Sequence, residues 1–174
     1  MKPVKKILAL ILAGVMALAL LTGCGKATSL NRTMAEGLAE YAKSSLAQVG
    51  NNNNISVSYQ VPELRRNIAP LFDETWITKD NSGDDALTEA AKETLTDILN
   101  PYKSAPFVIF SVTDITDVKT PFMAAANWVD SSINFSIPDS LNIPTPTITS
   151  LKIAVTQKTV NGRTYALAVI IYKA

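Results

Sequence analysis

The chain has 174 residues, of which 47% are apolar and 18% are charged, as in an ordinary globular protein. It contains no His and a single Cys, which excludes His-based catalytic triads, His-bound metals and an internal disulfide. The 16 basic and 15 acidic residues nearly balance, so the chain lacks the positive excess of an electrostatic nucleic-acid binder. We therefore expect no nucleic-acid partner, no cofactor and no metal site.

The first 23 residues have the pattern of a secretory signal peptide. A short basic segment, residues 1–6, precedes an uninterrupted apolar run over residues 7–21. A helix that spans a bilayer needs roughly 20 apolar residues, so this shorter run favours the apolar region of a signal peptide over a membrane span. An uncleaved signal anchor is the alternative.

The end of this leader resembles the lipobox of bacterial lipoproteins, which is a branched apolar residue, a small residue, Gly or Ala, and then Cys. The matching residues are Leu21, Thr22, Gly23 and Cys24. The resemblance implies that Cys24 is lipidated, that the chain is cut before it, and that the folded part lies on the extracytoplasmic side of a bacterial membrane. We therefore expect a signal peptide over residues 1–23, a tether over 24–32, and one α+β domain over 33–174.

Apolar periodicity predicts the elements of the first half of the domain. Thr33 and Glu36 have capping-box spacing and should open a helix. Its expected apolar stripe consists of Met34, Leu38, Tyr41, Ala42, Leu46 and Val49. Alternation of apolar and polar residues over 55–60 predicts a half-buried strand. Pro62 can begin a second helix, although Pro70 fits poorly inside it. Leu64, Ile68, Leu71 and Phe72 should share its buried face.

Two further helices and a strand are predicted after residue 80. Ser82 and Asp85 have the spacing of a second capping box, so we expect a helix over residues 84–99. Its expected apolar face consists of Leu87, Ala90, Ala91, Leu95, Ile98 and Leu99. Residues 107–112 are apolar and rich in strand formers, which predicts a buried strand. Thr120 and Pro121 should begin a short helix, and a loop with Pro138, Pro144 and Pro146 follows it.

The chain ends in a predicted β-hairpin. Asn161 and Gly162 form a type I′ turn signal. The expected pairs are Val155 with Ala168, Ile153 with Ile170, and Leu151 with Tyr172. Residues 165–172 are apolar on both faces, so their strand should be central and covered on both sides. The predicted fold is α+β, an α-β-α sandwich whose small, mainly antiparallel sheet ends in this hairpin.

Residues 84–174 also resemble the CAP superfamily (cysteine-rich secretory, antigen 5, pathogenesis-related 1). The similar segments are 85–91 (a helix with Leu and paired Ala), 112–116 (a strand), 126–131 (the Trp-x-x-Ser helix motif), and 151–154 with 160–165 (the closing hairpin). The resemblance implies the α-β-α sandwich. That family's cavity holds two His and two acidic residues, and here only Asp114 could stand for one of the acids. Asp114, Trp128 and Asp130 are the candidate groove residues of such a degenerate domain.

Other constellations suggest alternatives to a binding groove. Glu89 and Glu93 could be paired acids for glycoside chemistry, but they should lie on the solvated face of their helix. The segment 80–85, which has the sequence DNSGDD, lacks the Gly and Glu positions of an EF-hand, so we expect a turn rather than a calcium site. Aromatic residues that could line a groove are Tyr59, Trp76, Tyr102 and Trp128.

Together these patterns predict a lipid-anchored protein of the bacterial cell envelope. We expect a non-catalytic binding or scaffold module whose ligand is a glycan, a peptide or another protein. The alternative is a hydrolase that acts on envelope polymers through carboxylates.

Overall fold

The computed structural model describes residues 30–48, 50–118, 120–132 and 147–174. The predicted signal peptide, Cys24 and the proline-rich loop lie outside these residues. Within the described ranges, no helix is both long enough and apolar enough to cross a membrane.

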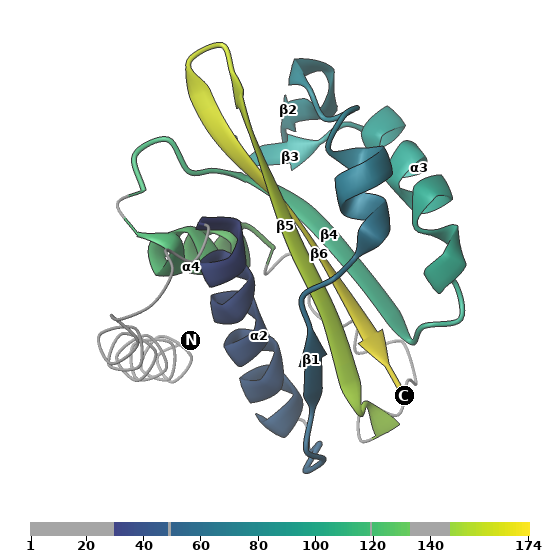
Figure 1. The fold of residues 1–174 in the computed structure, drawn as a ribbon. Helices are drawn as coiled ribbons and strands as arrows, with labels where there is room; N and C mark the ends of the chain where they lie inside the picture. The colour runs from purple at the N-terminus through teal and green to yellow at the C-terminus, as the bar shows by residue number, and fades with distance from the viewer. Residues whose placement is uncertain (1–29, 49, 119, 133–146) are drawn as a thin grey trace.

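A four-stranded sheet forms the centre of the molecule (Figure 1). Its strand order is β1-β5-β6-β4. The bounds are β1 Ser56–Ser58, β4 Phe107–Asp114, β5 Ser150–Val160 and β6 Arg163–Lys173. β1 is parallel to β5, whereas both β5 and β4 are antiparallel to β6. The prediction of a small, mainly antiparallel sheet is confirmed.

The C-terminal hairpin has the predicted register. Asn161 and Gly162 join β5 to β6 and have φ angles of 50° and 79°, as a type I′ turn requires. Ile153 pairs with Ile170, and the two neighbouring predicted pairs are also present. Residues 165–172 of β6 are all buried, since the strand is central and its alternating side chains enter a different core on each face of the sheet.

Two helices cover one face of the sheet. These are α2 (Leu30–Gln48) and α4 (Pro121–Ser132), which begins with the predicted cap at Thr120. The buried residues of α2 are Met34, Ala35, Leu38, Ala39, Ala42 and Leu46. Of the predicted stripe, Tyr41 is only partly buried against the same core, Val49 is outside the described residues, and the others are buried. The helix begins at Leu30 rather than at Thr33. Arg32 in this additional turn pairs with Glu36 at 2.8 Å, which extends the helix into the expected tether.

The other face carries shorter elements and a second core. They are η1 (Leu64–Ile68), η2 (Glu74–Trp76), the hairpin β2 (Ile77–Lys79) and β3 (Asp85–Leu87), α3 (Glu89–Ile98) and η3 (Asn100–Tyr102). Leu87, Ala91 and Leu95 pack in this core together with Leu167 and Ile171 of β6. Helical layers therefore lie on both faces of the sheet, as the predicted α-β-α sandwich requires.

The predicted start of the helix over residues 84–99 is wrong. Residues 85–87 pair with β2 as a strand, and the helix begins at Glu89 with Thr88 as its N-cap. The Asp80 carboxylate accepts the N–H groups of Ser82 and Asp84, so it closes the turn of a hairpin. Asp85 is held in β3, where its carboxylate lies 2.9 Å from Lys79 Nζ. The Ser82 and Asp85 spacing therefore belongs to a turn and not to a capping box.

The helix expected after Pro62 is also shorter than predicted. Its π-helical segment ends at Ile68, and the chain then turns at Pro70, which cannot donate a backbone hydrogen bond. Ile68 and Phe72 are buried as expected, but Leu71 is 50% exposed because the turn carries it away from the core.

Candidate functional site

Asp114, the predicted cavity acid, takes part in a local polar cluster at the end of β4. Its carboxylate accepts hydrogen bonds from the N–H and Oγ1 of Thr116, at 2.8 and 2.5 Å, and lies 3.4 Å from Arg163 Nη1. Thr116 Oγ1 in turn accepts the N–H of Thr164 at 2.9 Å. These contacts join the end of β4 to the C-terminal hairpin, so the carboxylate has a structural role in the described fold.

The structure describes only some of the other sequence candidates. Trp128 and Asp130 belong to α4, but their side chains are outside the described part of the structure, so the predicted groove around them stays a prediction. Glu89 and Glu93 are exposed, which confirms that they lie on a solvated face. Trp76 is buried against Phe72, at a ring separation of 6.0 Å, and is therefore a core residue rather than a binding residue.

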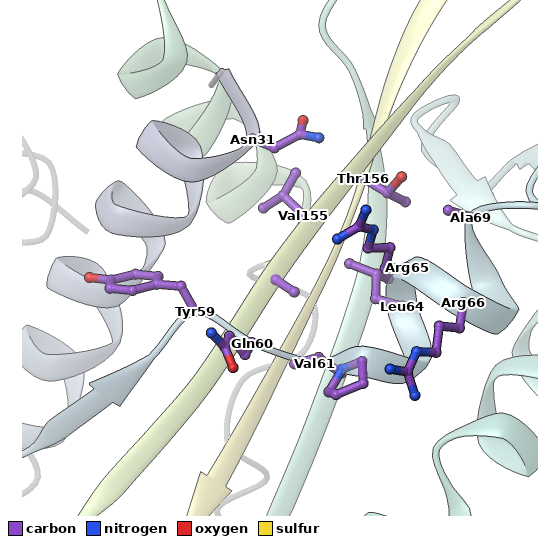
Figure 2. A pocket seen from close by; sticks show the side chains of 12 residues that line it. Asn31, Tyr59, Gln60, Val61, Leu64, Arg65, Arg66, Ala69, Val155 and Thr156 are labelled. Atoms are coloured by element: carbon purple, nitrogen blue, oxygen red, sulfur yellow. The ribbon is translucent and has the colours of Figure 1, made fainter. Parts of the chain in front are cut away.

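An open groove of about 900 Å³ lies between α2, η1 and β5. Its walls are the first turn of α2, the connection from β1 to η1, η1 itself, and the middle of β5. The lining residues are Asn31, Tyr59, Gln60, Val61, Pro62, Leu64, Arg65, Arg66, Ala69, Ala154, Val155 and Thr156. Of the predicted aromatic groove residues whose side chains the structure describes, only Tyr59 is among them. Figure 2 shows Tyr59 on the α2 side and the two arginines on the η1 side, with Val155 and Thr156 of β5 between them.

The lining of the groove is positively charged. Arg65 and Arg66 contribute two guanidinium groups, and none of the described lining residues is acidic. Both arginines are exposed, and neither forms an ion pair with any residue that the structure describes. An exposed guanidinium without a carboxylate partner is available for bidentate binding of a carboxylate or phosphate group.

Tyr59 is fixed in the groove wall by the N-terminal turn of α2. The Arg32 guanidinium lies over its ring, 3.6 Å from the ring centroid, and pairs with Glu36. Partial burial, followed in importance by the negative charge of Glu36, raises the pKa of the Tyr59 hydroxyl. Tyr59 therefore stays neutral at physiological pH. It presents a hydrogen-bonding hydroxyl and an apolar ring to the groove.

Part of the floor of the groove is an unpaired sheet edge. Val160 and Arg163 flank the two-residue turn and form a hydrogen-bonded pair, and such pairs alternate along an antiparallel ladder, so the even-numbered residues of β5 bond to β6. The odd-numbered residues of β5 therefore face β1. β1 ends at Ser58, opposite Lys152, so the backbone N–H and C=O groups of Val155 and Gln157 face an edge with no described strand beside it.

A hydrogen bond from Tyr102 fixes the η1 side of the groove. The Tyr102 hydroxyl donates to Glu63 Oε2 at 2.7 Å, directly before η1. Burial, together with this bond to a carboxylate, raises the pKa of Tyr102 to about 12. Because an unfolded tyrosine titrates near pH 10, this contact stabilises the fold fully below about pH 10 and loses its effect as the pH rises towards 12.

We expect the stabilising effect of Tyr102 to disappear between about pH 10 and 12. Urea unfolding of the wild type and of Tyr102→Phe should give a difference in unfolding free energy that is constant below pH 10 and shrinks above it. Glu63→Gln is the control, since it keeps an acceptor but removes the negative charge that opposes ionisation of the tyrosine. A difference that is unchanged up to pH 12 would contradict this assignment.

Comparisons of the chain with protein-family models, with curated proteins and with solved structures find no match. The resemblances to the lipobox and to the CAP superfamily therefore stay predictions.

Sequence reasoning did not identify Arg65, Arg66 or the free edge of β5 as a site. The adjacent arginines between Leu64 and Ile68 were a visible signal, because two cations occupy the polar positions of a short amphipathic segment. Their position beside β5 depends on contacts between residues about 90 positions apart in the chain, which no local pattern encodes.

Proposed function

We propose that this protein is a lipid-anchored binding module, held through Cys24 on the extracytoplasmic side of a bacterial membrane, whose groove binds an anionic ligand of the cell envelope. The observation that carries the proposal is the groove lining, in which Arg65 and Arg66 lie and no residue that the structure describes is acidic. A ligand with carboxylate or phosphate groups would be attracted to this lining by its charge.

The position of the groove agrees with a role near a membrane surface. α2 begins only six residues after Cys24, and Asn31 in its first turn lines the groove. An extended chain spans at most about 3.6 Å per residue, so an anchor at Cys24 would hold this turn within roughly 20 Å of the lipid surface. The ligand would then be a component found close to the membrane.

The groove does not favour the alternative of a carboxylate-based hydrolase. Acid-base hydrolysis of a glycoside requires two carboxylates about 5 to 9.5 Å apart beside the substrate. Among the described residues no acidic side chain lines this groove, and Asp114 is engaged with Arg163 and Thr116 in the polar cluster. The proposal of a binding module needs neither a catalytic residue nor the CAP resemblance.

A binding assay with defined anionic polymers tests the proposal. The full chain, purified in a non-ionic detergent, is titrated with fluorescent poly-glutamate, polyphosphate and polyuronate, and with neutral dextran as a reference. We expect at least one anionic polymer to bind, and the Arg65→Ser/Arg66→Ser double variant to weaken that binding at least about tenfold. Two lost charge-assisted contacts of roughly 1 kcal/mol each would have an effect of this size.

The matched control is Lys103→Ser/Lys173→Ser, which removes the same charge from exposed positions that do not line the groove. It should retain most of the affinity. Binding that falls equally in both double variants would indicate a general effect of net charge. That result, or the absence of binding to all three anionic polymers, would overturn the proposed function.

A further inference from the structure

We infer that the ligand of this groove is an extended acidic peptide segment, which adds as a strand to the free edge of β5. This inference rests on the proposed function and specifies its ligand class. Addition of a strand to an exposed edge is a recurrent mode of peptide recognition, in which backbone hydrogen bonds give affinity and flanking side chains give specificity.

The edge is open where the groove lies. β1 pairs with only three residues of β5, at positions 150–152, and the chain then leaves the edge through Tyr59 and Pro62 towards η1. In Figure 1, β1 accordingly runs beside only one end of the long strand β5. The rest of this edge of β5 presents the backbone groups of Val155 and Gln157. A peptide strand that continues the line of β1 could form hydrogen bonds with them.

A second observation indicates unmet hydrogen-bonding capacity in the same segment of β5. The Gln157 side-chain nitrogen Nε2 is buried and has no hydrogen-bond partner among the described residues. A buried donor without an acceptor is destabilising, by about 1–3 kcal/mol. Gln157 follows Val155 by two residues, so its side chain lies on the same face of β5 as that of Val155, on the α2 side.

The two walls of the groove predict the sequence of the peptide. Val155 and Tyr59 belong to the core on the α2 side, whereas Leu64 and Ala154 belong to the core on the η1 side, next to Arg65. Successive side chains of an added strand point to these two sides in alternation. The side chains that face η1 should therefore be acidic, and those that face α2 should be apolar.

Charge argues against two other occupants of the edge. Residues 25–29, which lead into α2, contain Lys26 and no acidic residue, so this segment would add positive charge beside the arginines. A second copy of the chain, paired edge to edge through β5, would bring two sets of Arg65 and Arg66 close together. An acidic peptide instead supplies the carboxylates that these arginines lack.

The experiment uses blocked hexapeptides with the sequence Glu-Val-Glu-Val-Glu-Val and the full chain in detergent. The acidic peptide should bind at low ionic strength, and its Lys-Val counterpart should bind at least about tenfold more weakly. In an edge strand, only alternate residues bond to the neighbouring strand. Of two peptides that are N-methylated at either the Glu or the Val positions, one should lose at least about tenfold in affinity and the other should bind almost normally.

Val155→Pro provides a test on the protein. It removes a backbone N–H on the free edge and leaves the hydrogen bonds between β5 and β6 intact, as proline is tolerated on an edge. Val155→Ala is the matched control for the lost side chain, and both variants are checked by thermal unfolding. We expect Val155→Pro to bind the acidic peptide several-fold more weakly than Val155→Ala. If Val155→Pro does not fold, the two N-methylated peptides decide the question with the wild-type chain.

The outcomes distinguish this inference from the proposed function. Equal binding, or equal loss of binding, for the two N-methylated peptides would overturn strand addition. Binding of polyphosphate or polyuronate through Arg65 and Arg66, without binding of the peptide, would overturn the inference but leave the proposed function standing. If Arg65 and Arg66 are required only for binding to vesicles that contain anionic lipid, the inference is likewise overturned and the proposed function stands. If no anionic probe binds, both proposals fall.

Discussion

Leu95→Asp is expected to abolish folding of the domain. Leu95 is 0% exposed on α3 and belongs to the core between η1 and the sheet, together with Ile68 and Phe72. Truncation of a buried Leu to Ala costs about 2–5 kcal/mol, and a buried carboxylate without a partner costs more. Since natural domains are stable by only about 5–15 kcal/mol, the substitution should remove most or all of the free energy of unfolding.

Circular dichroism and urea titration of the full chain measure this effect. Glu93→Ala is the matched control, because Glu93 lies on the same helix but is exposed. Its free energy of unfolding should change by less than about 0.5 kcal/mol. A cooperative unfolding transition of Leu95→Asp near that of the wild type would show that this core does not hold the two layers together.

Cys24→Ser is expected to abolish maturation of the protein in a bacterial host. If the segment from Leu21 to Cys24 is a lipobox, the thiol of Cys24 is the acylated group, and two or more acyl chains provide a stable membrane anchor. Mass spectrometry of the wild-type membrane fraction should then show a chain that begins at Cys24 and carries acyl mass. The variant should accumulate as an unacylated precursor that keeps residues 1–23.

Thr22→Ala is the control for this experiment. It changes the leader next to the same site but keeps a small residue at the lipobox position, so processing and acylation should continue. A wild-type protein that begins elsewhere than Cys24, or that carries no acyl mass, would contradict lipid anchoring. The groove could still bind a ligand in that case, but its proposed proximity to the membrane would lose its basis.

Local sequence determined much of the fold because several elements depend on interactions between near neighbours. The dipeptide Asn161-Gly162 accepts positive φ at both positions, which sets the turn and thereby the register of the whole C-terminal hairpin. Residues 165–172 are apolar on both faces, so only a central position in the sheet could bury them. The stripe of α2 and its contact with one face of the sheet follow from helical periodicity in the same way.

Local sequence was ambiguous where the same short polar residues are suited to both a helix cap and a tight turn. Asp80, Ser82 and Asp85 are equally suited to a helix cap and to a tight turn, since both need short polar side chains that bind backbone N–H groups. In the folded protein β2 pairs with β3, so these residues form part of a hairpin, and the helix begins after them with Thr88 as its N-cap. Likewise, helical periodicity predicted that Leu71 lies on the buried face. The chain turns at Pro70 instead, and Leu71 is exposed.

The candidate site was determined only by tertiary structure. The groove combines Asn31, Tyr59, Arg65 and Val155, which come from four segments of the chain. Its open edge exists because β1 is short and crosses away after Ser58, while β5 continues to Val160. Composition excluded His chemistry, and the leader predicted a location. Whether two neighbouring arginines face solvent or a sheet edge depends on strand order and strand length, which are set by packing between distant segments and not by the residues around them.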